Sequence, residues 1–187
     1  HSPAFLSLNP NNKIPAIIDP DGPGGQPLPL FESGAILIYL ADKTGKLMPQ
    51  DPAARYQVIQ WVMFQIGSVG PMFGQLGFFH KFAGKDYEDK RPRDRYVDES
   101  RRLLGVIEGQ LAQHAWIAGD EFTIADIQID AVNGLHRAIA FHDPLQADLR
   151  HVSPFTIIVG SIINNLDIID IIMIIDNASI ESGRMER

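Results

Sequence analysis

Two short apolar runs stand out in the first quarter of the chain, at residues 14–18 and 28–31. Residues 19–25, between them, contain two prolines and three glycines, which is a dense turn signal. The pattern therefore predicts an antiparallel hairpin with a long exposed loop. From Glu32 onward the apolar positions recur at helical spacing, and Gly45 is placed to end the helix, so the second strand should lead directly into it.

The following segment carries the signals of a new helix and of a domain boundary. Asp51 can cap this helix and Pro52 fits its first position, so we expect the boundary at residues 47–50. Residues 56–66 are strongly apolar and aromatic, whereas residues 67–77 contain four glycines. We expect a kinked helix beside a cavity there.

Two further features organise the middle of the chain. The charged run at residues 81–95 is interpreted as a solvated loop, and residues 96–111 carry the apolar stripe of the helix that follows it. Thr123 and Asp126 then fit a capping box, in which each side chain accepts a hydrogen bond from the other residue's backbone N–H. We assign these two residues to folding and not to catalysis.

The last part of the chain, residues 136–187, departs from these patterns. Residues 157–187 contain eleven isoleucines and no aromatic residue, which is atypical of an amphipathic surface helix. The most apolar stretch, residues 155–175, contains two asparagines and two aspartates. Each aspartate at membrane depth costs ~3 kcal/mol, so we reject a membrane span.

Composition excludes several classes of function. The net charge of -7 disfavours nucleic acid as a partner, because affinity for phosphates comes mainly from Lys and Arg. The absence of cysteine excludes disulfides, thiolate metal ligands and a cysteine nucleophile. The six histidines lack metal-ligand spacing, so we expect no metal site. The terminus His1–Ala4 shows no secretory signal, and a cytoplasmic location is therefore expected.

Two motifs at a fitting separation resemble the glutathione-binding half of glutathione S-transferases. The first runs from Asn9 to Ala16 with the sequence Asn-Pro-Asn-Asn-Lys-Ile-Pro-Ala, and the second starts at Glu32 with Glu-Ser-Gly-Ala-Ile. Residues 116–126 resemble the sixth-helix folding motif of the same superfamily. Residues 70–75, together with the Phe-Glu-Ser-Gly form of the second motif, are most similar to the bacterial Nu class, a disulfide-bond reductase type.

This resemblance implies an α/β plus all-α fold. Residues 1–47 would form the carboxy-terminal part of a thioredoxin-like domain, and residues 51–187 would form the helical-bundle C-terminal domain of a glutathione S-transferase. In the family a βαβ unit precedes the position of Phe5, and this chain has only four residues there. We therefore expect the amino-terminal unit to be absent, or the chain to be a fragment. Because the family's thiol-activating donor lies in that unit, no catalytic residue is identified.

The resemblance also implies which residues hold glutathione. The bond between Ile14 and Pro15 would be cis, so that the Ile14 backbone pairs with the cysteinyl backbone of the ligand. Glu32 and Ser33 would bind the two ends of the γ-glutamyl group, with the helix start favouring its carboxylate. Lys13 and Arg95 would pair with glutathione carboxylates. For Glu32 and Ser33 the alternative is helix capping alone, and for Lys13 and Arg95 it is a solvated surface charge.

The implied activity uses glutathione as co-substrate, with its thiolate attacking a small-molecule electrophile or a disulfide. Such an enzyme must favour the anion of a thiol whose ordinary pKa is about 8.5. The alternative is a regulatory or structural module of the same fold that has no turnover. Members of the superfamily usually form twofold dimers, so we expect a homodimer.

Overall fold

The computed structural model describes residues 2–130, which fall into two compact units, residues 2–44 and residues 45–130. Within residues 2–130, no helix combines the length and the apolar character needed to cross a bilayer. The atypical segment 136–187 and the apolar stretch 155–175 lie outside the described residues.

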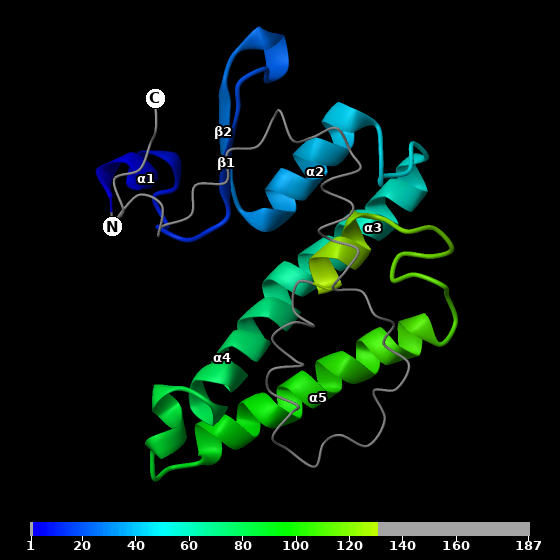
Figure 1. Ribbon diagram of the computed structural model, residues 1–187. Coiled ribbons are helices and arrows are strands. Elements are labelled where there is room, and N and C mark those ends of the chain that lie inside the picture. The colour runs from blue at the N-terminus through cyan, green and yellow to red at the C-terminus, as the bar shows by residue number, and fades with distance from the viewer. Residues whose placement is uncertain (1, 131–187) are drawn as a thin grey trace. The chain divides into compact units, whose positions relative to one another are not determined.

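The first unit contains a short helix, a two-stranded hairpin and a longer helix (Figure 1). β1 pairs antiparallel with β2, with Ala16 opposite Phe31 and Asp19 opposite Leu28, which confirms the predicted hairpin. The longer helix follows β2 directly, as the change of period predicts. The elements of this unit are α1 (Pro3–Leu8), β1 (Ala16–Asp19), a 3-10 turn (Pro23–Gly25), β2 (Leu28–Phe31) and α2 (Ser33–Thr44).

A buried carboxylate joins the far end of the hairpin to α2. Asp19, the last residue of β1, is 0% exposed, and its Oδ2 accepts hydrogen bonds from Tyr39 Oη and Lys43 Nζ, each at 2.5 Å. The Asp21 N–H donates to Asp19 Oδ1 at 2.9 Å. Lys43 also donates to the Asp21 carbonyl at 2.6 Å, so one lysine contacts both the end of the strand and the start of the loop.

These contacts determine the ionisation of the buried groups. Burial by itself raises the pKa of Asp19, but the hydrogen bonds from Lys43, Tyr39 and the Asp21 amide outweigh it, so this pKa lies below its usual range. Burial, together with the bond to the Asp19 carboxylate, raises the pKa of Tyr39 to about 12. Asp19 is therefore charged and Tyr39 neutral at neutral pH, and this pairing offsets the cost of a buried charge.

The second unit is helical in its described part. Gln65–Val69, a π-helical turn, joins α3 to α4 at the place where the sequence predicts a kink. Asp51 caps α3 by accepting from the Ala54 N–H at 2.8 Å, and Pro52 is its first residue, as predicted. α4 packs against α5 around a buried cluster. The helices are α3 (Pro52–Phe64), α4 (Gly70–His80), a 3-10 helix (Ala83–Asp86), α5 (Arg91–Leu111) and residues 124–130, and the cluster is Val69, Phe73 and Leu103.

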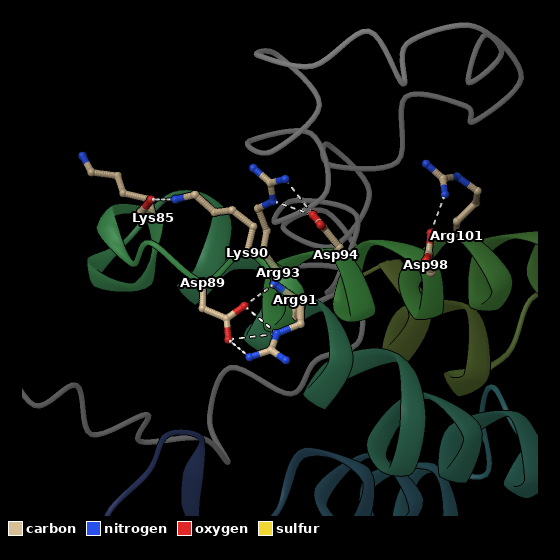
Figure 2. Close-up of polar contacts among 8 residues, drawn as sticks. All are labelled: Lys85, Asp89, Lys90, Arg91, Arg93, Asp94, Asp98 and Arg101. Carbon is tan, nitrogen blue, oxygen red and sulfur yellow. Dashed lines mark hydrogen bonds and ion pairs between the residues drawn. The ribbon is translucent and has the colours of Figure 1, made fainter.

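The interpretation of residues 81–95 as a loop is wrong for its last part, because α5 already begins at Arg91. Asp89 accepts from the Arg91 backbone N–H at 3.0 Å and also pairs with the Arg91 guanidinium (Figure 2). Pro92 suits the first turn of a helix, where its missing N–H costs no hydrogen bond. Arg93 pairs with Asp94 and Arg101 with Asp98 along the exposed face of α5 (Figure 2).

The capping residues at the last described helix are buried. The Asp126 carboxylate accepts from the Thr123 N–H at 2.8 Å, which is the reciprocal half of the predicted capping box. Thr123 Oγ1 accepts from the Ala125 N–H at 3.3 Å. Asp126 also accepts from the Ile117 N–H at 2.8 Å, a contact nine residues back along the chain that the capping box does not include. One carboxylate thus fixes both the helix start and the preceding turn.

Candidate functional site

The register of the hairpin sets which residues meet at its near end. Ala16 and Phe31 form the pair at this end of the hairpin, so Pro15 and Glu32 are the next residues beyond that pair. α2 begins at the next residue, Ser33. The hairpin therefore brings the two sequence motifs, which are far apart in the chain, to one end of the first unit.

The Ile14–Pro15 bond is cis, as the resemblance implies. The Ile14 side chain belongs to the exposed large hydrophobic residues, at 62% relative exposure, and β1 begins only at Ala16. Within residues 2–130, neither the N–H nor the C=O of Ile14 forms a backbone hydrogen bond. Ile14 therefore presents an unpaired N–H and C=O close to the start of β1. An extended peptide can pair with such groups as an added strand.

Glu32 connects the strand to the helix in an uncommon backbone conformation. Its φ is 70°, in the left-handed region, which costs a residue other than glycine about 1–2 kcal/mol. Its carbonyl accepts from the Ile36 N–H at 3.0 Å, so Glu32 is the residue that precedes the first turn of α2. The N–H groups of a first helical turn have no partner within the helix, and the positive end of the dipole favours an anion. The sequence alone gives no sign of the strained backbone.

The two predicted cationic residues lie in different units. Lys13 is exposed and directly precedes Ile14, so it belongs to the same end of the hairpin. Arg95 is exposed and lies on α5, in the second unit. Its charge acts on Glu99 one turn further along, where the hydrogen bond from Arg102, and then the nearby charges, lower the pKa of the Glu99 carboxyl. The roles of Lys13 and Arg95 in binding stay predictions.

A buried asparagine, the first residue of the motif that runs from Asn9 to Ala16, supports this end of the unit. Asn9 is 2% exposed and follows α1 directly. Its side-chain NH2 donates to the Lys13 carbonyl at 2.5 Å, and its side-chain oxygen accepts from the Asn11 N–H at 2.9 Å. The residue therefore closes the loop that leads into Ile14. In the sequence it reads as an ordinary turn residue, and only its burial distinguishes it.

Among residues 2–130, no three His, Cys, Asp or Glu side chains are grouped closely enough to hold a metal ion. The groups gathered at the hairpin end are main-chain donors and acceptors, one carboxylate, one hydroxyl and one lysine. Such a set suits a zwitterionic peptide, whose carboxylate, ammonium and amide groups match it in turn.

Comparison with known sequences identifies the family of both parts of the chain. The model of the glutathione S-transferase N-terminal domain matches residues 1–42, and that of the C-terminal domain matches residues 63–156. The chain is 44% identical over 126 residues to the disulfide-bond oxidoreductase YfcG of Escherichia coli, covering 67% of this chain and 58% of YfcG. It is 42% identical over 128 residues to YghU of the same organism, covering 68% of this chain and 43% of YghU.

Solved structures give the same result. A glutathione transferase from Burkholderia graminis, with two glutathione molecules bound per subunit, is 70% identical with a TM-score of 0.68, over 73% of this chain and 59% of that one. A glutathione transferase from Pseudomonas putida, with one glutathione disulfide bound per subunit, is 56% identical with a TM-score of 0.66, over 76% and 71%. The chain thus spans about three fifths of the length of YfcG and of the Burkholderia protein. It belongs to the glutathione S-transferase family, with a thioredoxin-like part followed by a helical part.

Proposed function

We propose that the chain binds glutathione at the near end of the hairpin and that the complete protein uses the glutathione thiolate to reduce disulfides or to attack electrophiles. The observation that carries this proposal is the register that pairs Ala16 with Phe31, because Pro15 and Glu32 then follow at the same end of the hairpin. It brings the exposed Ile14, two residues before β1, and the start of α2 at Ser33 to the same end of the hairpin. One small peptide can bind to the Ile14 backbone and to the start of α2 at the same time.

Each part of the ligand has a counterpart in this arrangement. The cysteinyl backbone would pair with the N–H and C=O of Ile14 as a short added strand. The γ-glutamyl carboxylate would lie at the start of α2, where the Ser33 hydroxyl can donate to it, and the α-ammonium would pair with Glu32. Lys13 is the candidate for the glycyl carboxylate. For Arg95, pairing with a glutathione carboxylate stays a prediction from the resemblance alone.

The proposed chemistry is thiol–disulfide exchange in two steps. The glutathione thiolate attacks one sulfur of the substrate disulfide, and the S–S bond breaks to release the other sulfur as a thiolate, which takes up a proton. A second glutathione thiolate then attacks the mixed disulfide and releases the second substrate thiol together with glutathione disulfide. Two glutathione molecules are bound in one relative and glutathione disulfide in another, and these are the forms that such a reaction consumes and produces.

Finer assignments are part of the same proposal. We infer a Nu-class protein that works in the cytoplasm as a twofold dimer, with residues 1–47 and 51–187 as its two domains. Its similarity to two disulfide-bond oxidoreductases of Escherichia coli supports the Nu-class assignment. The other candidate, a module that binds glutathione without turnover, shares the whole binding arrangement, so only an activity measurement separates the two.

Calorimetric titration of the chain with glutathione tests the binding. Ser33→Ala should weaken the affinity roughly tenfold or more, because a hydrogen bond to a charged group contributes ~1.5–3 kcal/mol. Ser7→Ala is the matched control, since Ser7 is an exposed serine of α1 in the same unit. The absence of binding to the parent chain at millimolar glutathione, or equal affinities of the parent and Ser33→Ala, would refute the site. In the full-length protein, reduction of a small disulfide supports the enzyme, and binding without reduction supports the module.

A further inference from the structure

We propose that Asn9 is a positioning residue for glutathione, because its buried side chain fixes the peptide plane that carries the Ile14 N–H. This inference rests on the proposed function, in which that N–H donates to the cysteinyl carbonyl of the ligand. Asn9 lies outside the set of ligand-contacting residues and would act only through the backbone between Asn9 and Ile14.

The geometry of the peptide group gives the mechanism. The Lys13 carbonyl and the Ile14 N–H belong to one planar trans peptide group, in which the two point in opposite directions. The Asn9 NH2 donates to this carbonyl at 2.5 Å, and Asn9 is 2% exposed, so the carbonyl is directed into the protein. The N–H on the other side of the plane must then be directed away from Asn9, on the side of the exposed Ile14.

The Asn9 side chain can hold this plane because it is itself fixed at every polar group. Its side-chain oxygen accepts from the Asn11 N–H at 2.9 Å, which leaves only the NH2 for the Lys13 carbonyl. Its own N–H donates to the Phe5 carbonyl at 2.9 Å, and its carbonyl accepts from the Asn12 N–H at 3.0 Å. Phe5 is 0% exposed, so the chain of contacts ends in the buried part of the unit.

Only an amide satisfies both side-chain contacts. A carboxylate at position 9 keeps the acceptor for the Asn11 N–H but loses the donor, and it places a negative charge against the Lys13 carbonyl. Alanine loses both contacts. The inference therefore predicts that Asn9→Asp and Asn9→Ala release the same peptide plane, although Asn9→Asp removes no volume.

The experiment compares two probes in calorimetric titrations. One is glutathione, and the other is its ester analogue, in which the bond between cysteine and glycine is an ester and the cysteinyl carbonyl is a weaker acceptor. The parent chain should bind the ester several-fold more weakly than glutathione. Asn9→Asp and Asn9→Ala should bind glutathione about three- to tenfold more weakly, as expected for one hydrogen bond. In both variants, most of the parent's difference in affinity between glutathione and the ester should also be lost. Asn11→Asp, at an exposed position of the same loop, is the matched control and should keep both values.

The outcomes separate a positioning role from a structural one and from failure of the proposed function. A parent chain that does not bind glutathione refutes the proposed function itself. Folded Asn9 variants that bind glutathione like the parent, or that lose affinity for both probes equally with the discrimination intact, overturn the role of Asn9 alone. Urea unfolding shows which variants are folded. If Asn9→Ala is unfolded, the discrimination measured in Asn9→Asp decides. If Asn9→Asp is unfolded as well, Asn9 is needed for folding and the positioning role is rejected.

Discussion

Replacing Asp126 by alanine is expected to destabilise the second unit strongly, although the residue is remote in sequence from every proposed ligand contact. The Asp126 carboxylate accepts from the backbone N–H groups of Ile117 and Thr123, both at 2.8 Å, and from the Thr123 hydroxyl at 3.1 Å. Ile117 is 2% and Thr123 is 5% exposed, so water has little access to the donors that the substitution leaves behind.

The magnitude follows from these two buried N–H groups. Each hydrogen bond to a charged acceptor contributes ~1.5–3 kcal/mol, and a buried donor left without a partner costs ~1–3 kcal/mol. Removing the buried carboxylate also removes its desolvation cost, which opposes the loss. We therefore expect a decrease of about 3 kcal/mol in the free energy of unfolding, a large part of the 5–15 kcal/mol that is typical of a domain.

Urea unfolding followed by tryptophan fluorescence measures this change. Trp116 lies in the affected turn, with its ring 5.1 Å from that of Phe122 in an edge-to-face contact, so its emission should report the loss of this turn. With a slope of about 2 kcal/mol per molar urea, the midpoint should fall by roughly 1.5 M. Asp120→Ala removes an equal charge from an exposed position of the same turn and should change stability by no more than about 0.5 kcal/mol.

The pH dependence gives a second, independent check. Burial raises the pKa of Asp126, although the hydrogen bonds from Ile117 and Thr123 oppose this effect. Because the pKa of Asp126 is higher in the folded than in the unfolded state, the folded state binds the proton more tightly. This contribution to the free energy of unfolding is complete below the unfolded-state pKa of about 3.9 and is lost as the pH rises through the raised pKa of the folded state. The stability difference between the parent and Asp126→Ala should therefore widen as the pH is lowered from about 7. A loss no larger than that of Asp120→Ala, or a difference that narrows on acidification, would contradict the reasoning.

Other expectations concern the first unit. The stability difference between the parent and Asp19→Asn should be constant above about pH 5 and shrink as the pH falls through the lowered pKa of Asp19, which urea unfolding at a series of pH values measures. The pKa of Tyr39 is raised to about 12, so its phenolate absorbance, identified as the part that Tyr39→Phe removes, should appear in the parent only near pH 12. The contribution of Tyr39 to the free energy of unfolding should be lost in the same pH range. Glu32→Gly should be more stable than Glu32→Ala by about 1 kcal/mol, because glycine relieves the left-handed backbone, while both variants bind glutathione more weakly than the parent in calorimetry.

The sequence is sufficient to predict those helices and strands whose signals lie within a few neighbouring residues. The hairpin follows from two apolar runs around a proline- and glycine-rich turn, and the start of α3 follows from Asp51 and Pro52. The predicted start of α5 is wrong because a run of charges is not by itself a loop signal. Charge alone does not prevent a helix, and Pro92 was the local sign that one begins there.

The polar residues that support the candidate site could not be recognised in this way. Asn9 and Asp19 both stand in segments rich in Pro, Asn and Gly, where they look like turn residues. They differ from such residues by being 2% and 0% exposed, and burial depends on packing between segments far apart in the chain. One weak sign was present for Asp19: Tyr39 and Lys43 are four residues apart and therefore share one face of α2.

The main-chain groups of the proposed site and the buried side chain that supports them should differ in how well they tolerate substitution. The contacts proposed for the cysteinyl backbone use the main-chain N–H and C=O of Ile14, which any residue other than proline supplies, so they place little demand on the side chain at position 14. What makes the Ile14 N–H available is its direction, and under the inference above this direction depends on Asn9 beside the Lys13 carbonyl. Under the proposed function, a substitution of buried Asn9 should therefore weaken glutathione binding in the calorimetric titration, although Asn9 lies outside the proposed ligand contacts.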